Sequence, residues 1–149
     1  MAVVTPIDKK TRMQPALRRA KIMIADDDPN LRQALSLRLR ANDYQTISAC
    51  DGYSTLALAQ KERPDLIVLD LGLPAGDGFA VLTHLRGFPS LASIPVIVLT
   101  ARDPQANEKL ALESGAAAFF QKPADNHELL EVIRICLQAE RNWDGKLPS

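Results

Sequence analysis

Charged and hydroxyl side chains stand at the ends of four apolar segments of this chain. They are Asp26, Asp27, Asp28, Asp70, Thr100 and Lys122. Carboxylates gathered in one pocket repel one another, and a hard divalent cation such as Mg²⁺ relieves that repulsion. A hydroxyl donor and a lysine ammonium beside them suit the oxygens of a phosphoryl group. Together these residue types predict metal-assisted transfer of a phosphoryl group to a carboxylate, if the fold brings them to one place.

Apolar runs alternate with segments of helical periodicity from residue 22 onward. The predicted strands cover residues 22–25, 44–49, 66–69, 94–99 and 116–120. The predicted helices cover residues 29–41, 56–60 (ended by Pro64), 79–85 and 105–113, with a last helix capped by Asp125 or Asn126. Strict alternation of five strands and five helices predicts an α/β fold, a doubly wound parallel sheet.

The expected sheet explains how distant residues would meet. Residues 66–69 are four consecutive aliphatic side chains, a pattern typical of a strand buried on both faces. In such sheets ligands bind beyond the carboxyl ends of the strands, where the acidic residues, Thr100 and Lys122 all follow their strands. Asp28 precedes Pro29, and we expect it to cap a helix.

The composition is that of an ordinary globular protein, with 46% apolar and 24% charged residues. Eighteen basic and eighteen acidic residues cancel, which argues against a field that attracts nucleic acid or a membrane surface. Residues 1–20 are basic, and we expect a flexible leader there, a domain over 21–141 and a loose tail over 142–149.

No apolar run has the length of a signal peptide or a membrane span. Cys50 and Cys136 lack the spacing of a redox or metal motif, and we expect two buried or half-buried free thiols. These features favour a cytoplasmic protein. His84 and His127 have no ligand spacing, and we expect both at the surface.

Four motifs, taken together and in order, resemble the receiver domain of two-component response regulators. They are the segment 22–29 (IMIADDDP), the segment 69–74 (LDLGLP) with Asp77-Gly78, the segment 94–101 (IPVIVLTA) and the segment 121–123 (QKP). The resemblance covers about residues 20–140. It implies the flavodoxin-like strand order 2-1-3-4-5 and a stand-alone receiver of the chemotaxis type.

The resemblance also implies a role for each site residue. Asp70 would be the phosphoacceptor. Asp27, Asp70 and the backbone carbonyl of Gly72 would bind Mg²⁺ or Mn²⁺ directly, and Asp26 would reach the metal through water. Lys122 would bind the phosphoryl group, and its bond to Pro123 would be cis.

Thr100 would be the switch hydroxyl and Phe119 the aromatic that reorients with it. One residue departs from the commonest pattern of the family, and two others stand at positions that vary within it. Phe119 stands where many relatives have tyrosine. Gly72 and Arg102, each two residues beyond a key residue, occupy positions that the family uses to adjust phosphoryl lifetime.

The resulting functional hypothesis is a signalling switch rather than an enzyme. A sensor histidine kinase or histidine phosphotransfer protein would phosphorylate Asp70, and the surface over residues 105–140 would then bind a downstream protein or a second copy. We consider three alternatives. The chain could be a phosphorelay shuttle or a degenerate receiver that acts as a scaffold. It could also be a phosphatase of the haloacid-dehalogenase type, in which Asp26 and Asp28 would form the acidic motif. We expect no direct contact with nucleic acid or membrane.

Overall fold

A single five-stranded parallel sheet organises the computed structural model, which describes residues 19–75 and 77–142. Its strands are β1 (Lys21–Ala25), β2 (Gln45–Ala49), β3 (Leu66–Leu69), β4 (Val96–Thr100) and β5 (Ala118–Gln121). The helices in the described residues are α2 (Pro29–Ala41), α3 (Gly52–Glu62), α4 (Gly78–Gly87), α5 (Pro104–Glu113) and α6 (Asn126–Asn142). The strand order is β2-β1-β3-β4-β5, so the predicted fold class and strand order are confirmed.

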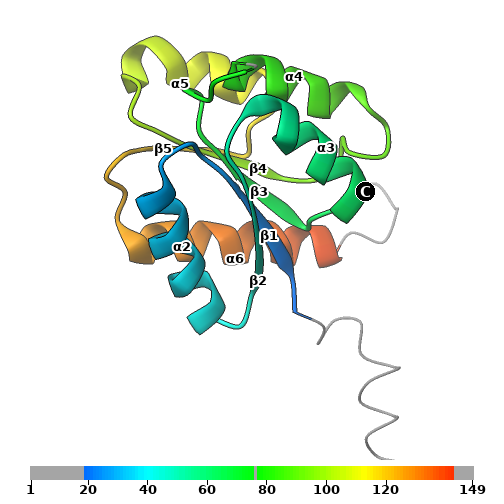
Figure 1. Cartoon of the computed structure of the whole chain (residues 1–149), viewed down its shortest axis with the longest axis vertical. Helices are drawn as coiled ribbons and strands as arrows, with labels where there is room; N and C mark the ends of the chain where they lie inside the picture. The colour runs from blue at the N-terminus through cyan, green and yellow to red at the C-terminus, as the bar shows by residue number, and fades with distance from the viewer. Residues whose placement is uncertain (1–18, 76, 143–149) are drawn as a thin grey trace, which may run out of the picture.

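Helices cover both faces of the sheet. Helices α3, α4 and α5 lie on one side, and α2 and α6 lie on the other (Figure 1). The alternation of side chains along each strand divides the core in two, because successive residues point to opposite faces. Ile67 packs in the layer of α3, α4 and α5, whereas Val68 packs in the layer of α2 and α6. This explains why the central strands are continuously aliphatic.

Each of the five helices in the described residues begins beside an aspartate whose carboxylate accepts a backbone N–H, as the sequence predicts for Asp28 and Asp125. The carboxylate of Asp28 accepts the backbone N–H of Asn30 at 2.9 Å, which confirms the predicted cap of α2. Asp51 accepts the N–H of Ser54 at 2.7 Å, so α3 begins at Gly52, before the expected residue 56. Asp77 caps α4 in the same way.

Two predicted strands begin too early, and hydrogen bonds explain both differences. Strand β5 starts at Ala118 rather than 116, because the N–H of Ala116 donates to Ala111 and closes the end of α5 around Gly115. Strand β4 starts at Val96 rather than 94, because the N–H of Ile94 donates to Leu91 in a turn. The other described boundaries agree within two residues.

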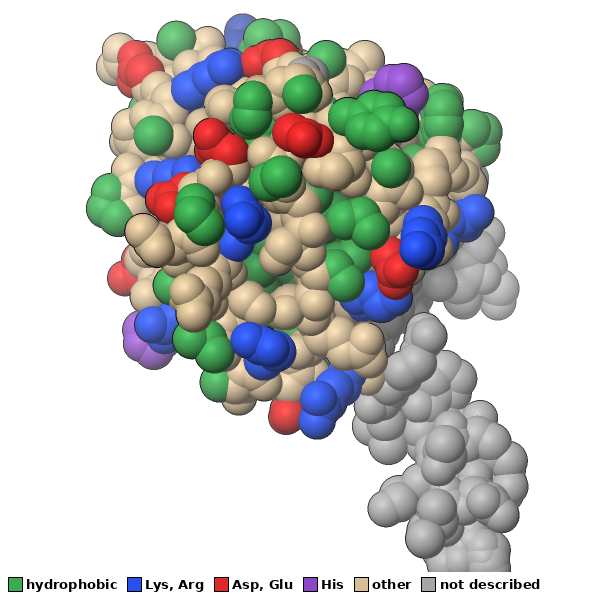
Figure 2. Space-filling view, in the orientation of Figure 1, with side chains coloured by type: hydrophobic (Ala, Val, Ile, Leu, Met, Phe, Trp, Pro, Cys, Tyr) green, Lys and Arg blue, Asp and Glu red, His purple; other side chains and the backbone are tan. Residues whose placement is uncertain are grey.

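Surface features correct one further expectation. Cys50 is exposed rather than buried or half-buried, because it directly follows β2 at the sheet edge, whereas Cys136 is half-buried; both are free thiols. His84 and His127 are exposed, as expected. Figure 2 shows acidic, basic and apolar side chains interspersed over one face of the molecule.

No helix in the described ranges is both long enough and apolar enough to span a bilayer. The predicted leader over 1–20 lies outside the described residues except for its last two positions, and the predicted tail lies outside them except for its first. The predicted domain over 21–141 stays a prediction.

Candidate functional site

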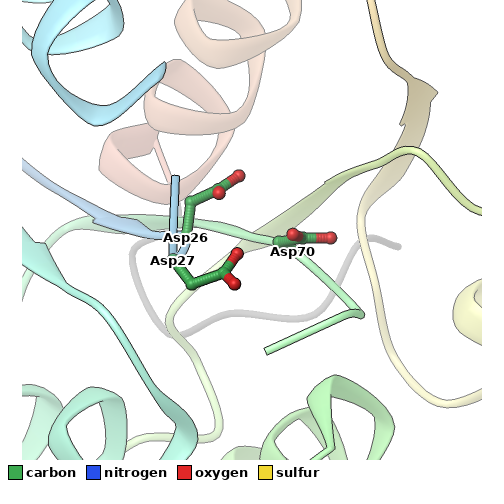
Figure 3. A group of neighbouring side chains, drawn as sticks. All are labelled: Asp26, Asp27 and Asp70. Atoms are coloured by element: carbon green, nitrogen blue, oxygen red, sulfur yellow. The ribbon is translucent and has the colours of Figure 1, made fainter. Parts of the chain in front are cut away.

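The carboxyl ends of the strands bring the predicted site residues together. Asp26 directly follows β1, and its backbone N–H donates to Ala49 at the end of β2 at 3.0 Å. Asp70 directly follows β3, and its N–H donates to Ala25 of β1 at 2.9 Å. These bonds extend the ladder by one residue on each strand. Both carboxylates therefore leave the sheet at the same edge, beside Asp27 (Figure 3).

Lys122 connects two of the carboxylates. Its Nζ lies 2.7 Å from Oδ2 of Asp26 and 3.3 Å from Oδ2 of Asp70. The backbone holds the lysine in place, since its N–H donates to the carbonyl of Thr100 at 2.8 Å. The peptide bond between Lys122 and Pro123 is cis, as the resemblance implied. A residue that follows the edge strand thus reaches the centre of the site.

The three carboxylates are close enough to share one cation. Oxygen atoms of Asp26, Asp27 and Asp70 lie within 4.8 Å of one another. Both oxygens of Asp26 accept protein donors, namely the N–H of Asp28 at 2.9 Å and the lysine. Asp70 accepts the N–H of Gly72 at 3.0 Å as well as the lysine. Asp27 is exposed, and no donor from the described residues binds its carboxylate.

Burial sets the electrostatics of the site. Desolvation has the largest effect on Asp26 and, with the charge of Asp70, raises its pKa, although the hydrogen bonds from Lys122 and Asp28 and the charge of Lys122 act in the opposite direction. Desolvation alone would lower the pKa of Lys122, but the hydrogen bond and charge of Asp26, together with Asp70, raise it. The lysine is therefore held as a cation among three carboxylates. The remaining negative charge and the oxygen donors suit a hard divalent cation.

Thr100 and Phe119 occupy neighbouring strands on one side of the sheet. Thr100 is 1% exposed, and its hydroxyl accepts the N–H of Arg102 at 3.3 Å. Phe119 pairs with Val98 in the β4–β5 ladder, two positions before Thr100. Because residues two apart share a face, Thr100 and Phe119 point to the same helix layer. Phe119 and Phe120 are both half-buried, and each packs against a different core cluster.

Two glycines shape the surroundings of Asp70. A Cβ at Gly72 would meet only the two carboxylate oxygens of Asp70 among the described residues that are not its chain neighbours, at 3.7 Å and 3.8 Å, so there is open space beside the carboxylate. A Cβ at Gly78 would lie 2.4 Å from Cα of Leu71 and 2.7 Å from the carbonyl oxygen of Asp70. Helix α4 therefore begins in direct contact with the backbone of Asp70, which no larger residue would permit.

The structure adds contacts at the site that the sequence analysis did not predict. Arg32, in the first turn of α2, donates from Nη1 to the carbonyl of Asp26 at 2.7 Å and so fixes the end of β1. Its position six residues after Asp26 carries no motif that would have revealed it. Arg102 forms an ion pair with Asp77 at 3.0 Å, which connects the loop after β4 to the start of α4.

A parallel sheet in this order, with a lysine between carboxylates at its carboxyl edge, defines the class of receiver-like α/β domains. The family model of the response regulator receiver domain matches residues 22–134. The chain therefore belongs to the response-regulator receiver family.

Known relatives and structures agree with this assignment. The chain is 40% identical over 118 residues to the DNA-binding dual master transcriptional regulator RpaA of Synechocystis, covering 79% of this chain and 49% of that protein. It matches the Francisella response regulator 1452 receiver domain with a TM-score of 0.75 and 31% identity, covering 81% of this chain and 98% of that one.

It also matches the receiver domain of a sensor histidine kinase from Pseudomonas aeruginosa, with a TM-score of 0.74 and 25% identity, covering 80% of this chain and 98% of that one. That structure has a magnesium ion coordinated in its active-site cleft. The chain spans between a quarter and about half of the length of the curated relatives it matches.

Proposed function

We propose that this chain accepts a phosphoryl group on Asp70 in a reaction that needs Mg²⁺ or Mn²⁺, and that it acts as a signalling switch. The observation that carries the proposal is the position of Lys122, which contacts both Asp70 and Asp26 beside a third carboxylate. Asp70 is 7% exposed, and the room beside Gly72 borders its carboxylate oxygens, where a phosphodonor would approach them. Lys122 would neutralise the charge of the incoming phosphoryl oxygens.

Asp27, Asp70 and the carbonyl of Gly72 would hold the metal directly, with Asp26 acting through water. The exposure of Asp27 supports its direct role, whereas Asp26 and Asp70 each have protein donors on both oxygens, so the division between those two follows the family resemblance. When bound, the metal would supply positive charge to the acceptor carboxylate and the phosphoryl oxygens. The hydroxyl of Thr100 would donate a hydrogen bond to the phosphoryl group. Phe119, which lies on the same face of the sheet, would reorient together with Thr100.

The phosphodonor would be a sensor histidine kinase or a histidine phosphotransfer protein, in the cytoplasm. The output would be a change in the surface over residues 105–140, which binds a downstream protein or a second copy. Leu110 and Ile135 support this proposal, because half of each side chain is exposed on α5 and α6. The expectation of a stand-alone receiver stays a prediction.

Phosphorylation with a small phosphodonor tests the proposal directly. The purified chain is incubated with acetyl phosphate and Mg²⁺, and intact mass is measured with and without a chelator. We expect one added phosphoryl group that requires the metal and is lost in Asp70→Asn. Asp28→Asn is the matched control, because asparagine also caps helices and Asp28 lies at α2 rather than against Lys122.

Two results would contradict the proposal. One is a phosphoryl group that persists in Asp70→Asn, which would place the acceptor elsewhere. The other is continuous release of phosphate that depends on Asp28, which would favour the phosphatase alternative.

A further inference from the structure

An ion pair stands beside the candidate site and joins two of its loops. Nη2 of Arg102 lies 3.0 Å from Oδ1 of Asp77, with 40% and 47% of their side chains exposed. Arg102 lies in the loop after β4, and Asp77 lies at the start of α4. An exposed pair of this kind contributes little to stability and separates easily. It therefore suits a contact that forms in one state of the protein and opens in another.

Asp77 uses its two carboxylate oxygens for different contacts. Oδ2 accepts the N–H of Phe79 at 3.1 Å and caps α4, while Oδ1 holds the guanidinium. The next residue, Gly78, packs against the backbone of Asp70 and donates its N–H to Leu71 at 3.0 Å. The carboxylate that holds Arg102 is thus fixed next to the acceptor segment.

Arg102 is anchored next to the site by its backbone. Its N–H donates to the hydroxyl of Thr100, the residue that ends β4 at the site. The space over Gly72 beside the Asp70 carboxylate is open. A phosphoryl group on Asp70 would present three oxygens and more negative charge than the Asp77 carboxylate, and a guanidinium binds phosphoryl oxygens through its paired N–H groups. Asp77 and a phosphorylated Asp70 would therefore compete for one arginine.

We propose that Asp77 withholds Arg102 from the site in the unphosphorylated protein, and that this competition sets how tightly the site binds a phosphoryl group. The inference rests on the proposed function of Asp70. Arg102 becomes a ligand of the phosphoryl group once the pair opens, and Asp77 is a positioning residue that acts through Arg102. Removing the charge of Asp77 then strengthens the site, whereas removing Arg102 weakens it.

Beryllofluoride, which stands in for a phosphoryl group on a carboxylate, tests the competition at equilibrium. Bound beryllofluoride is measured by ¹⁹F NMR with Mg²⁺ for the wild type, Asp77→Asn, Arg102→Gln and the double variant. Asparagine keeps the cap of α4 and removes the charge. We expect Asp77→Asn to bind about two- to fivefold more tightly, the size of an exposed pair, and Arg102→Gln to bind more weakly. In the Arg102→Gln background, Asp77→Asn should have no effect.

A second measurement needs neither metal nor anion. The guanidinium N–H signals of Arg102 in the free protein should change in Asp77→Asn and stay unchanged in Asp28→Asn, since Asp28 is the matched cap of α2.

Equal or weaker binding by Asp77→Asn would overturn the inference. So would the same gain in the Arg102→Gln background, because the gain would then come from the removal of a nearby negative charge. Failure of the proposed function gives a different result, namely no binding by the wild type or unchanged binding by Asp70→Asn.

Discussion

Each end of the sheet places one lysine among carboxylates, and the two arrangements differ in burial. At the amino end, Nζ of Lys21 lies 3.0 Å from Glu62, and the backbone N–H of Lys21 donates to Asp65 at 2.7 Å. At the carboxyl end, Lys122 contacts Asp26 and Asp70. The first group is partly exposed, whereas the carboxylates of the second group that touch the lysine are buried.

The pKa shifts have opposite directions at the two ends. The hydrogen bond and charge of Lys21 lower the pKa of Glu62, so this pair stabilises the folded chain. Burial raises the pKa of Asp26, so its ionised form opposes folding despite the lysine. The ion pair thus supports the fold at the amino end, whereas at the carboxyl end ionised Asp26 opposes folding and the cation of Lys122 favours it. A site kept at such a cost is the expected mark of function.

Loss of the lysine should produce the largest difference between the two ends. Lys122→Met leaves Asp26 and Asp70 buried without their cation, and we expect a loss of roughly 3 kcal/mol in the free energy of unfolding. Lys21→Met removes a partly exposed pair and should cost at most about 1 kcal/mol. Urea unfolding of both variants in chelator measures the difference. Equal losses would mean that burial does not distinguish the two ends.

Addition of Mg²⁺ should act on the carboxyl end alone. A metal at a hundred times its dissociation constant stabilises the folded state by about 2.7 kcal/mol, because it binds that state selectively. Thermal unfolding with Mg²⁺ and with chelator tests this in the wild type. Asp27→Asn should abolish the response, while Lys21→Met, at the other end, should keep it. A response that survives Asp27→Asn would place the cation elsewhere.

Asp26→Asn should stabilise the metal-free protein. The raised pKa means that ionisation of Asp26 lowers stability as pH rises through its folded value. The variant should therefore match the wild type below pH 3.8, the ordinary value of this carboxyl, and exceed it at neutral pH. Urea unfolding across pH in chelator provides the measurement, with Asp28→Asn as control. A variant less stable than the wild type at neutral pH would contradict the assigned sign.

Glu62→Gln should give the smallest effect, in the opposite direction. The contribution of Glu62 is present above its ordinary pKa of 4.5 and is lost as pH falls through the lowered value. The variant should be slightly less stable than the wild type at neutral pH and should converge with it in acid. The same unfolding series detects this, and a gap that widens as pH falls would refute it.

The sequence predicts the fold well because its signals are local. Continuous aliphatic runs such as residues 66–69 identify strands buried on both faces. Every residue of such a strand is apolar because successive side chains pack alternately into the two core clusters. Strand starts were less predictable. The backbone N–H of Ala116 donates to Ala111 and closes the end of α5 instead of extending β5. Hydrogen bonding around Gly115, rather than strand propensity, therefore determines where β5 begins.

The candidate site was predictable in its residues and not in its contacts. Parallel strands deliver Asp26, Asp70 and Lys122 to one edge whatever their side-chain geometry. The preference of Lys122 for Asp26 over Asp70, 2.7 Å against 3.3 Å, depends on packing that no motif encodes. The same holds for Arg32, whose contact with the Asp26 carbonyl depends on where the first turn of α2 passes.

The contact between Lys122 and the carboxylates has a consequence for protein synthesis. Lys122 follows β5, the last strand of the sheet along the sequence, 52 residues after Asp70. A nascent chain that has released β1, β2, β3 and β4 from the ribosome carries every carboxylate of the site without the cation that balances them. If Asp70 accepts a phosphoryl group as proposed, that reaction would have to wait until the final strand has joined the sheet.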